Sequence, residues 1–281
     1  MMQLLRMLGL VGWVLIIIPL QAGALLLKLK AAGRIPRRFH RGVTRIFGIQ
    51  IVTSGQMSEI HPTLFVSNHI SYLDIFVFGA VIEGSFVAKS DIANWPIAGW
   101  LAKMQRTIFV DREQRTKIGE QRTRVQEHFE SGGNVMLFPE GTSYDGARVL
   151  NFKSALFSVA QNQVNGHAVT VQPVSIAYTE MDGLPLTRAQ RPLVAWYGDM
   201  ALLPHIWSFL KAQRTKVEIQ FHEPVKMDDY ANRRAMASAC QKIVSAGVTA
   251  MVTGRAFPTP ALPTPDAQIA LPVAPCEVAG T

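Results

Sequence analysis

Apolar residues are concentrated at the start of the chain. Residues 8–27 form a run of 20 residues with no charge and one strongly polar side chain, Gln21. A straight helix of this length, at ~1.5 Å per residue, spans ~30 Å, about one bilayer core. Pro19 and the glycines of the run favour a bend, so a hairpin that only dips into the bilayer stays open. In both cases the run predicts an apolar helical membrane anchor.

Short β-rich runs alternate with helical periodicity after residue 50. Helical spacing covers residues 118–129, which Gly132 and Gly133 close, and it recurs over 156–159 and 235–248. The predicted strands are residues 63–66, 85–88, 107–110, 135–138, 171–178 and 216–221. This alternation predicts an α/β domain with a mixed or largely parallel sheet flanked by helices. A β-rich sandwich is the alternative.

The composition divides the chain into three parts. Residues 1–45 hold the anchor and its basic flank, and residues 46–250 hold the α/β domain. Residues 251–281 are rich in proline and poor in large apolar side chains, so they are predicted to be a disordered tail. Within the domain, residues 190–210 form a proline-interrupted loop that ends in an apolar run. That run either joins the core or enters the bilayer.

The positive charge is as localised as the apolar residues. The formal net charge is +8, and no acidic residue precedes Glu59. Eight basic residues lie in that region: Arg6, Lys28, Lys30, Arg34, Arg37, Arg38, Arg41 and Arg45. A basic cluster directly after an apolar segment favours anionic lipid headgroups and a cytoplasmic position. A nucleic-acid-binding arm is the weaker interpretation, because only Phe39 is aromatic in the cluster.

A cleaved signal peptide is the rival explanation of the N-terminus. Arg6 would be its charged region, residues 8–20 its apolar region, and Ala22-Gly23-Ala24 its cleavage site. The apolar run continues past this point through Leu27, and the basic cluster would then follow the cut. Both observations favour a retained anchor.

Cysteine and histidine indicate no metal or disulfide framework. Cys240 and Cys276 are the only cysteines, and the seven histidines include no pair at the spacing of a helical metal site. We therefore expect no metal.

His69 and Asp74 are the strongest candidates for catalysis. They lie five residues apart, so on one continuous helix their side chains would point ~140° apart and could not meet. We predict instead that a strand ends before His69 and that a helix begins with Ser71 as its N-cap, which puts Asp74 at the N3 position. Asp74 then reaches the imidazole, fixes its tautomer and leaves the second ring nitrogen to accept a proton. A loop histidine beside a capping carboxylate is the alternative.

A second motif, Phe138-Pro139-Glu140-Gly141-Thr142, follows the predicted strand 135–138. The strand end places Glu140 at the carboxyl edge of a sheet, where α/β sites form. Gly141 permits close backbone approach, and its N–H and the Thr142 hydroxyl are candidates to hold a polar headgroup. Ser143 lacks the glycine two residues on that a nucleophile elbow requires, so it is not expected to be a nucleophile.

In four ordered blocks the chain resembles the glycerophospholipid acyltransferase family of bacterial lysophosphatidic acid acyltransferases. The blocks are Asn68-His69 with Asp74, Arg112 after the run 107–110, residues 138–142, and the strand around Pro173. The resemblance implies a glycerolipid acyltransferase-like fold. It also implies that His69 deprotonates a lysolipid hydroxyl that attacks an acyl thioester, while Asp74 orients the imidazole.

The same resemblance implies the remaining roles. Arg112, Glu140, Gly141 and Thr142 would bind the acceptor headgroup, since a guanidinium suits phosphate or carboxylate. Lys89 is the candidate donor to the developing oxyanion. No cofactor is expected, and the donor would be acyl-acyl carrier protein or acyl-coenzyme A.

Several stretches outside the four blocks look closer to lyso-ornithine lipid acyltransferases, namely residues 88–99, 173–179 and 196–205. Lysophosphatidic acid and lyso-ornithine lipid therefore both stay open as acceptors. The implied partners are membrane lipids and, transiently, acyl carrier protein, which is acidic and suits the basic N-terminal region. The implied location is the cytoplasmic face of the inner membrane. A lipid-binding protein without catalysis and an ester hydrolase are the alternatives, and the sequence indicates no oligomeric state.

Overall fold

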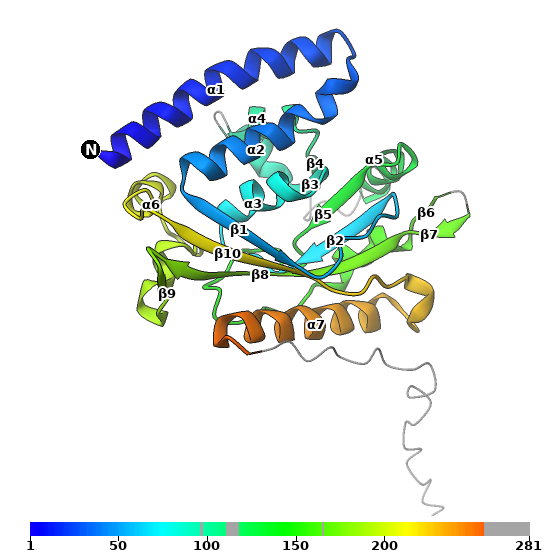
Figure 1. Ribbon diagram of the computed structural model, residues 1–281. Coiled ribbons are helices and arrows are strands. Elements are labelled where there is room, and N and C mark those ends of the chain that lie inside the picture. The colour runs from blue at the N-terminus through cyan, green and yellow to red at the C-terminus, as the bar shows by residue number, and fades with distance from the viewer. Residues whose placement is uncertain (96–97, 111–117, 165, 256–281) are drawn as a thin grey trace, which may run out of the picture.

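One mixed sheet organises the molecule, as Figure 1 shows for the computed structural model, which describes residues 1–95, 98–110, 118–164 and 166–255. The strand order is β1-β10-β8-β2-β5-β3-β4, and β9 pairs with β8. Strands β8, β2, β5, β3 and β4 are mutually parallel, and β10 joins β8 antiparallel with β1 parallel to β10. The bounds are β1 (Ile49–Ser54), β2 (Thr63–Ser67), β3 (Gly84–Lys89), β4 (Ile108–Val110), β5 (Asn134–Leu137), β8 (Thr170–Met181), β9 (Leu184–Pro185) and β10 (Thr215–Phe221). A separate hairpin pairs β6 (Gln163–Val164) with β7 (His167–Ala168).

Helices cover both faces of the sheet, which explains why its central strands β2, β5 and most of β8 are continuously buried. All five residues of β2 are buried. Phe65 belongs to the core under α2 (Ile35–Ile46) and α3 (Leu73–Val81), whereas Leu64 and Val66 belong to the opposite core. That second core lies under α5 (Ile118–Glu130), the 3₁₀ helix η4 (Ser154–Gln161) and α7 (Arg233–Thr253).

The N-terminal segment is a helical hairpin that packs on the domain. Helix α1 (Met2–Leu26) continues through Pro19, and the 3₁₀ helix η1 (Lys30–Gly33) leads into α2, against which α1 packs. Figure 1 shows α1 lying across the domain above α2, on the face of the sheet opposite α7. Both α1 and α7 are long and apolar enough to cross a bilayer, but α7 contributes core side chains.

The mixed α/β class and all six predicted strands are confirmed. The strand β1 and the short β6, β7 and β9 were not predicted. The predicted start of the helix at Ser71 is wrong, because α3 begins at Leu73 and the Ser71 hydroxyl has no hydrogen-bond partner. The tail from residue 256 onward lies outside the described residues.

The loop 190–210 contains two short helices, the 3₁₀ helix η5 (Arg188–Leu193) and α6 (Leu202–Phe209). Helix α6 is two-sided: Phe209 is buried, while Leu203 is 75% and Trp207 is 46% exposed. The apolar run therefore joins the core with one side and presents apolar side chains outward with the other. Other short helices are η2 (Ser90–Asn94), α4 (Ala98–Met104) and η6 (Met227–Asp229).

Candidate active site

The site begins where β2 ends. Asn68 is buried directly after the strand, and its side-chain amide bridges to β8: Nδ2 donates to the Ile176 carbonyl and Oδ1 accepts from the Ile176 N–H, both at 3.0 Å. Through these two bonds, the Asn68 side chain continues the hydrogen bonding between β2 and β8 beyond the last residue of β2. They fix the chain immediately before His69, a role that the sequence reasoning did not find.

Asp74 is the centre of the hydrogen bonding around His69. Its carboxylate is 0% exposed, and Oδ2 lies 2.8 Å from His69 Nδ1. The same oxygen accepts from the backbone N–H groups of Ile70 at 2.6 Å and Ser71 at 3.0 Å. Because α3 begins at Leu73, Asp74 lies in its first turn and reaches back over the preceding loop. The predicted proximity of the pair is therefore seen, although the helix start differs.

Tyr178 supplies the remaining partner of Asp74. The tyrosine lies on β8, and its hydroxyl donates to Asp74 Oδ1 at 2.9 Å. Burial first, and then the Asp74 charge, raise the pKa of Tyr178 well above its ordinary value, so this hydroxyl stays protonated. The sequence did not predict this contact, since more than a hundred residues separate the partners.

The His69 imidazole is held on its face as well as its edge. Its ring stacks on Phe138 with centroids 4.1 Å apart and an interplanar angle of 15°. With Nδ1 donating to a carboxylate, Nε2 is the ring nitrogen without a proton. No residue in the described part of the chain bonds to Nε2, and the side chain is 19% exposed. This is the arrangement of a general base that is open to substrate.

Glu140 lies beneath the turn that follows β5, and it is 2% exposed. Its Oε1 accepts from the Leu150 N–H at 3.2 Å, while Oε2 has no hydrogen-bond partner among the described residues. Burial raises the pKa of Glu140 to about 8, with the Leu150 and His69 N–H groups opposing and the Asp74 charge adding to the rise. The carboxyl is therefore largely neutral at pH 7 and supports the turn from inside.

The other predicted residues lie at varied positions. The Gly141 N–H donates to the Phe138 carbonyl at 3.1 Å, with a positive φ of 74° that favours glycine. Thr142 is exposed. Lys89 ends β3 at the same edge of the sheet, where its ammonium pairs with Asp91 at 2.5 Å. Arg112 lies outside the described residues, two positions after β4 ends.

The segment after η5 closes the site from the side. The Trp196 N–H donates to the Ile70 carbonyl at 3.0 Å, and the Trp196 carbonyl accepts from the Ser143 hydroxyl at 2.5 Å. Trp196 therefore ties the His69 turn to the turn after Glu140. The Ser143 hydroxyl is engaged in this contact, consistent with its exclusion as a nucleophile.

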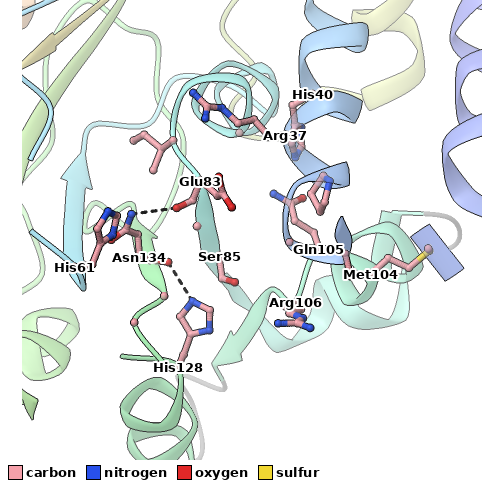
Figure 2. A pocket seen from close by; sticks show the side chains of 18 residues that line it. Arg37, His40, His61, Glu83, Ser85, Met104, Gln105, Arg106, His128 and Asn134 are labelled. Atoms are coloured by element: carbon pink, nitrogen blue, oxygen red, sulfur yellow. Dashed lines mark hydrogen bonds between the residues drawn. The ribbon is translucent and has the colours of Figure 1, made fainter. Parts of the chain in front are cut away.

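A cavity of about 390 Å³ lies at the opposite, amino edge of the parallel strands. Figure 2 shows Asn134 at its wall: Nδ2 donates to the Glu83 carbonyl at 3.1 Å, and the Asn134 carbonyl lies 3.2 Å from His128 Nε2. These polar groups join the starts of β2, β5 and β3 and are remote from His69. Among the described residues, no group of three or more His, Cys, Asp or Glu side chains is placed to hold a metal ion.

A buried carboxylate that orients a partly exposed histidine, at the carboxyl edge of an α/β sheet, is an arrangement that can act as a general base toward a hydroxyl group. The family model described as Acyltransferase matches residues 48–177. A lyso-ornithine lipid O-acyltransferase from Brucella abortus is 42% identical over 245 residues, covering 86% of this chain and 92% of the relative. A 1-acyl-sn-glycerol-3-phosphate acyltransferase from Neisseria meningitidis is 32% identical over 183 residues, covering 64% and 68%.

The crystal structure of the 1-acyl-sn-glycerophosphate acyltransferase PlsC from Thermotoga maritima has the same fold, with a TM-score of 0.60 at 20% identity. The match covers 89% of this chain and 97% of that one. The chain belongs to the acyltransferase family, and the family predicted from the four blocks is confirmed. It is an acyltransferase of lipid biosynthesis.

Removing the Tyr178 hydroxyl tests its contact with Asp74. In Tyr178→Phe, Asp74 Oδ1 loses the one side-chain donor that the described residues give it in this buried position, and an unsatisfied buried acceptor costs about 1–3 kcal/mol. We expect kcat to fall about tenfold, equivalent to ~1.4 kcal/mol, with both KM values unchanged. Steady-state kinetics measures this, and Tyr230→Phe, in the opposite core, is the control. Equal kcat values in the two variants would contradict the role.

The raised pKa of Glu140 predicts a pH-dependent stability. A carboxyl that titrates near 8 when folded and near 4.5 when unfolded stabilises the fold below pH 4.5, and this contribution is lost as pH rises to about 8. Glu140→Gln keeps the acceptor for Leu150 and removes the titration. Relative to this variant, the wild type should lose about 2–4 kcal/mol of unfolding free energy between pH 5 and 8.5. Urea denaturation at both pH values measures the difference; parallel profiles would show that Glu140 is ionised when folded.

Proposed function

We propose that the protein transfers a fatty acyl group from an acyl thioester to the free hydroxyl of a lysolipid, with lyso-ornithine lipid as the main acceptor. The observation that carries the chemistry is the 2.8 Å contact between His69 Nδ1 and the buried Asp74 carboxylate. The acceptor is supported by the 42% identity to a lyso-ornithine lipid O-acyltransferase over most of the chain, against 32% to the 1-acyl-sn-glycerol-3-phosphate acyltransferase over less of it.

The reaction follows from the position of the two nitrogens of His69. Nε2 accepts the proton of the lysolipid hydroxyl as its oxygen attacks the thioester carbonyl carbon, and Asp74 stabilises the imidazolium. A C–O bond forms, and the collapse of the tetrahedral intermediate breaks the C–S bond. The imidazolium returns its proton to the leaving thiolate, which releases the free thiol and regenerates His69. No covalent acyl-enzyme is needed, because the alcohol itself is the nucleophile.

The headgroup of the acceptor contacts the turn at Gly141 and Thr142, with Arg112 as a further ligand. Thr142 is exposed beside the His69 turn, and its hydroxyl suits a carboxylate or phosphate oxygen. Buried Glu140 sets the position of this turn through its bond to Leu150.

The protein is membrane-bound through α1, which lies along the bilayer surface. Gln3 donates to the Trp207 carbonyl at 3.0 Å and Gln21 donates to the Met104 carbonyl at 3.0 Å, so both halves of α1 are attached to one domain. At ~1.5 Å per residue, these contacts are ~27 Å apart along the helix. The outward side carries exposed apolar residues, namely Leu4, Leu5, Leu8, Val11, Leu15, Ile16 and Leu20. Such a helix immerses one face in the lipid.

Aromatic side chains at both ends of α1 extend this surface. Trp95 and Trp100 are 43% and 47% exposed near Met104, and Trp207 is 46% exposed near Gln3. Tryptophan favours the interface between lipid and water. The basic residues of α2 suit an anionic leaflet, which supports the cytoplasmic face of the inner membrane as the location.

The acyl-transfer proposal is tested with labelled acyl donor and both lysolipids offered in parallel. We expect faster transfer to lyso-ornithine lipid than to lysophosphatidic acid, and loss of both reactions in His69→Ala while folding and vesicle binding persist. Thin-layer chromatography of the labelled lipids identifies the product. Faster phosphatidic acid formation would reassign the acceptor, and near-wild-type turnover of His69→Ala would overturn the mechanism. Free fatty acid released without acceptor would indicate a hydrolase.

The membrane surface is tested by charging the outward side of α1. Leu15 and Leu184 are both 68% exposed, but Leu184 lies on β9, away from α1. Leu15→Glu should weaken binding to anionic vesicles about tenfold or more, since burying a leucine side chain is worth ~1.5–3 kcal/mol. Leu184→Glu is the matched control and should bind as the wild type. Equal binding of both variants in a flotation assay would show that α1 does not enter the lipid.

A further inference from the structure

An arginine-lined cavity lies beside the catalytic turn and has no part in the chemistry described so far. It is open to solvent, with a volume of about 620 Å³. Arg148, Arg188 and Arg191 line it, and Asp145 is the one acidic residue among its described lining residues. Three guanidinium groups around one carboxylate leave the cavity with a surplus of positive charge.

Arg191 shows that the cavity is built rather than a chance gathering of surface side chains. Arg191 is only 9% exposed, and its Nη1 donates to the Gly146 carbonyl at 2.7 Å. Burial lowers the pKa of Arg191, Asp145 opposes this shift, and the like charge of Arg188 adds to it. Asp145 is the one negative charge among the described lining residues, so three guanidinium groups share it. A bound anion would add a second negative charge.

The cavity is connected directly to His69. The Tyr144 N–H donates to the His69 carbonyl at 3.0 Å. The hydroxyl of the same tyrosine accepts from Arg148 at 3.1 Å, and the Arg148 guanidinium lies over the ring, 5.2 Å from its centroid. One residue therefore has its backbone on the catalytic turn and its side chain on the cavity wall.

The position of the cavity indicates which substrate reaches it. Val252 of α7 forms part of the wall. Figure 1 shows α7 on the face of the sheet opposite α1, and therefore on the side away from the proposed membrane surface. The lysolipid is held in the membrane, whereas the thioester donor arrives from water. The anion that enters from this side belongs to the water-soluble substrate.

We propose that the cavity binds the phosphate of the pantetheine carrier that bears the acyl thioester. This inference rests on the proposed function. An arginine guanidinium binds phosphate through paired N–H groups that match two phosphate oxygens. Phosphopantetheine carries its phosphate and its thiol at opposite ends of a flexible arm, so the phosphate can lie in the cavity while the thioester lies at His69. Coenzyme A and a phosphopantetheinylated carrier protein share this chemistry.

A carrier protein bound in this way contacts the cavity and not the basic N-terminal region, where the sequence led us to expect it. The basic residues before residue 46 lie on the α1 and α2 side of the sheet, and Arg6, Arg37 and Arg41 among them donate to backbone carbonyls of the domain. The carrier meets the arginines of the cavity instead, on the far side of the sheet.

Charge reversal at the two exposed arginines tests the site. Arg148→Glu with Arg188→Glu leaves buried Arg191 in place, and Arg234→Glu, exposed at the other end of α7, is the matched control. Donor KM should rise about fivefold for acyl-coenzyme A and for acyl-carrier protein, because two positive charges that attract the phosphate become negative. KM for the lysolipid and kcat should be unchanged. Acyl-pantetheine without phosphate should be used equally well by all variants.

Asp145→Asn supplies a test of opposite sign. It keeps the oxygen that accepts from the Ala147 N–H at 2.8 Å and removes the one negative charge, so KM for both phosphorylated donors should fall. A rise in lysolipid KM with unchanged donor KM would overturn the proposal and assign the cavity to the acceptor headgroup. Unchanged donor KM in every variant would refute the site while leaving acyl transfer intact. If wild-type protein transfers no acyl group from any thioester, the proposed function itself fails.

An effect on one phosphorylated donor alone identifies the source of the phosphate. A change confined to acyl-coenzyme A assigns the cavity to the nucleotide, and a change confined to the carrier-protein donor assigns it to the protein-bound prosthetic group. A change for acyl-pantetheine as well would contradict phosphate recognition, since that donor has none.

Discussion

The structure around His69 depends on the hydrogen bonds to one buried carboxylate. Asp74 accepts from an imidazole, two backbone amides and a phenol. A fully buried carboxylate is costly unless its lone pairs are satisfied. Its donors come from the His69 turn and from β8, whereas Asp74 itself lies in the first turn of α3. Strand, turn and helix therefore have to assemble together before the charge is stabilised. The same contacts orient the His69 imidazole, so the local fold and the proposed general base depend on one set of hydrogen bonds.

Sequence reasoning found the elements of this site but not its supporting contacts. The six strands could be predicted because each is a short apolar run in the sequence. The His69–Asp74 contact could be predicted because a continuous helix would hold the two side chains apart, whereas a turn followed by a helix brings them together. The contacts of Asn68 and Tyr178 with partners about a hundred residues away depend on β2 lying beside β8. The pairing of β2 with β8 depends on the order of the strands in the sheet, and the spacing of residues along the sequence does not reveal that order.

Ser71 and Glu140 have surroundings in the structure that differ from those expected from the sequence. Ser71 has the chemistry of an N-cap, yet Asp74 itself accepts from the amides before α3, so the helix begins two residues later. The family resemblance implies that Glu140, which follows a strand at the sheet edge, helps to bind the acceptor headgroup. The side chain turns inward instead, where burial favours its neutral form. The motif Pro139-Glu140-Gly141 predicts the position of the turn, but it does not predict the direction of the Glu140 side chain.

The attachment of α1 at both halves has a consequence for how the enzyme encounters its acceptor. Since both halves of α1 bond to the domain, the proposed membrane contact of α1 would hold His69 at one distance from the lipid surface. The acceptor would then be met by lateral diffusion in two dimensions, and its effective concentration would be its mole fraction in the leaflet. Diluting the lysolipid with other lipids would slow the reaction even when the total amount in the sample is unchanged.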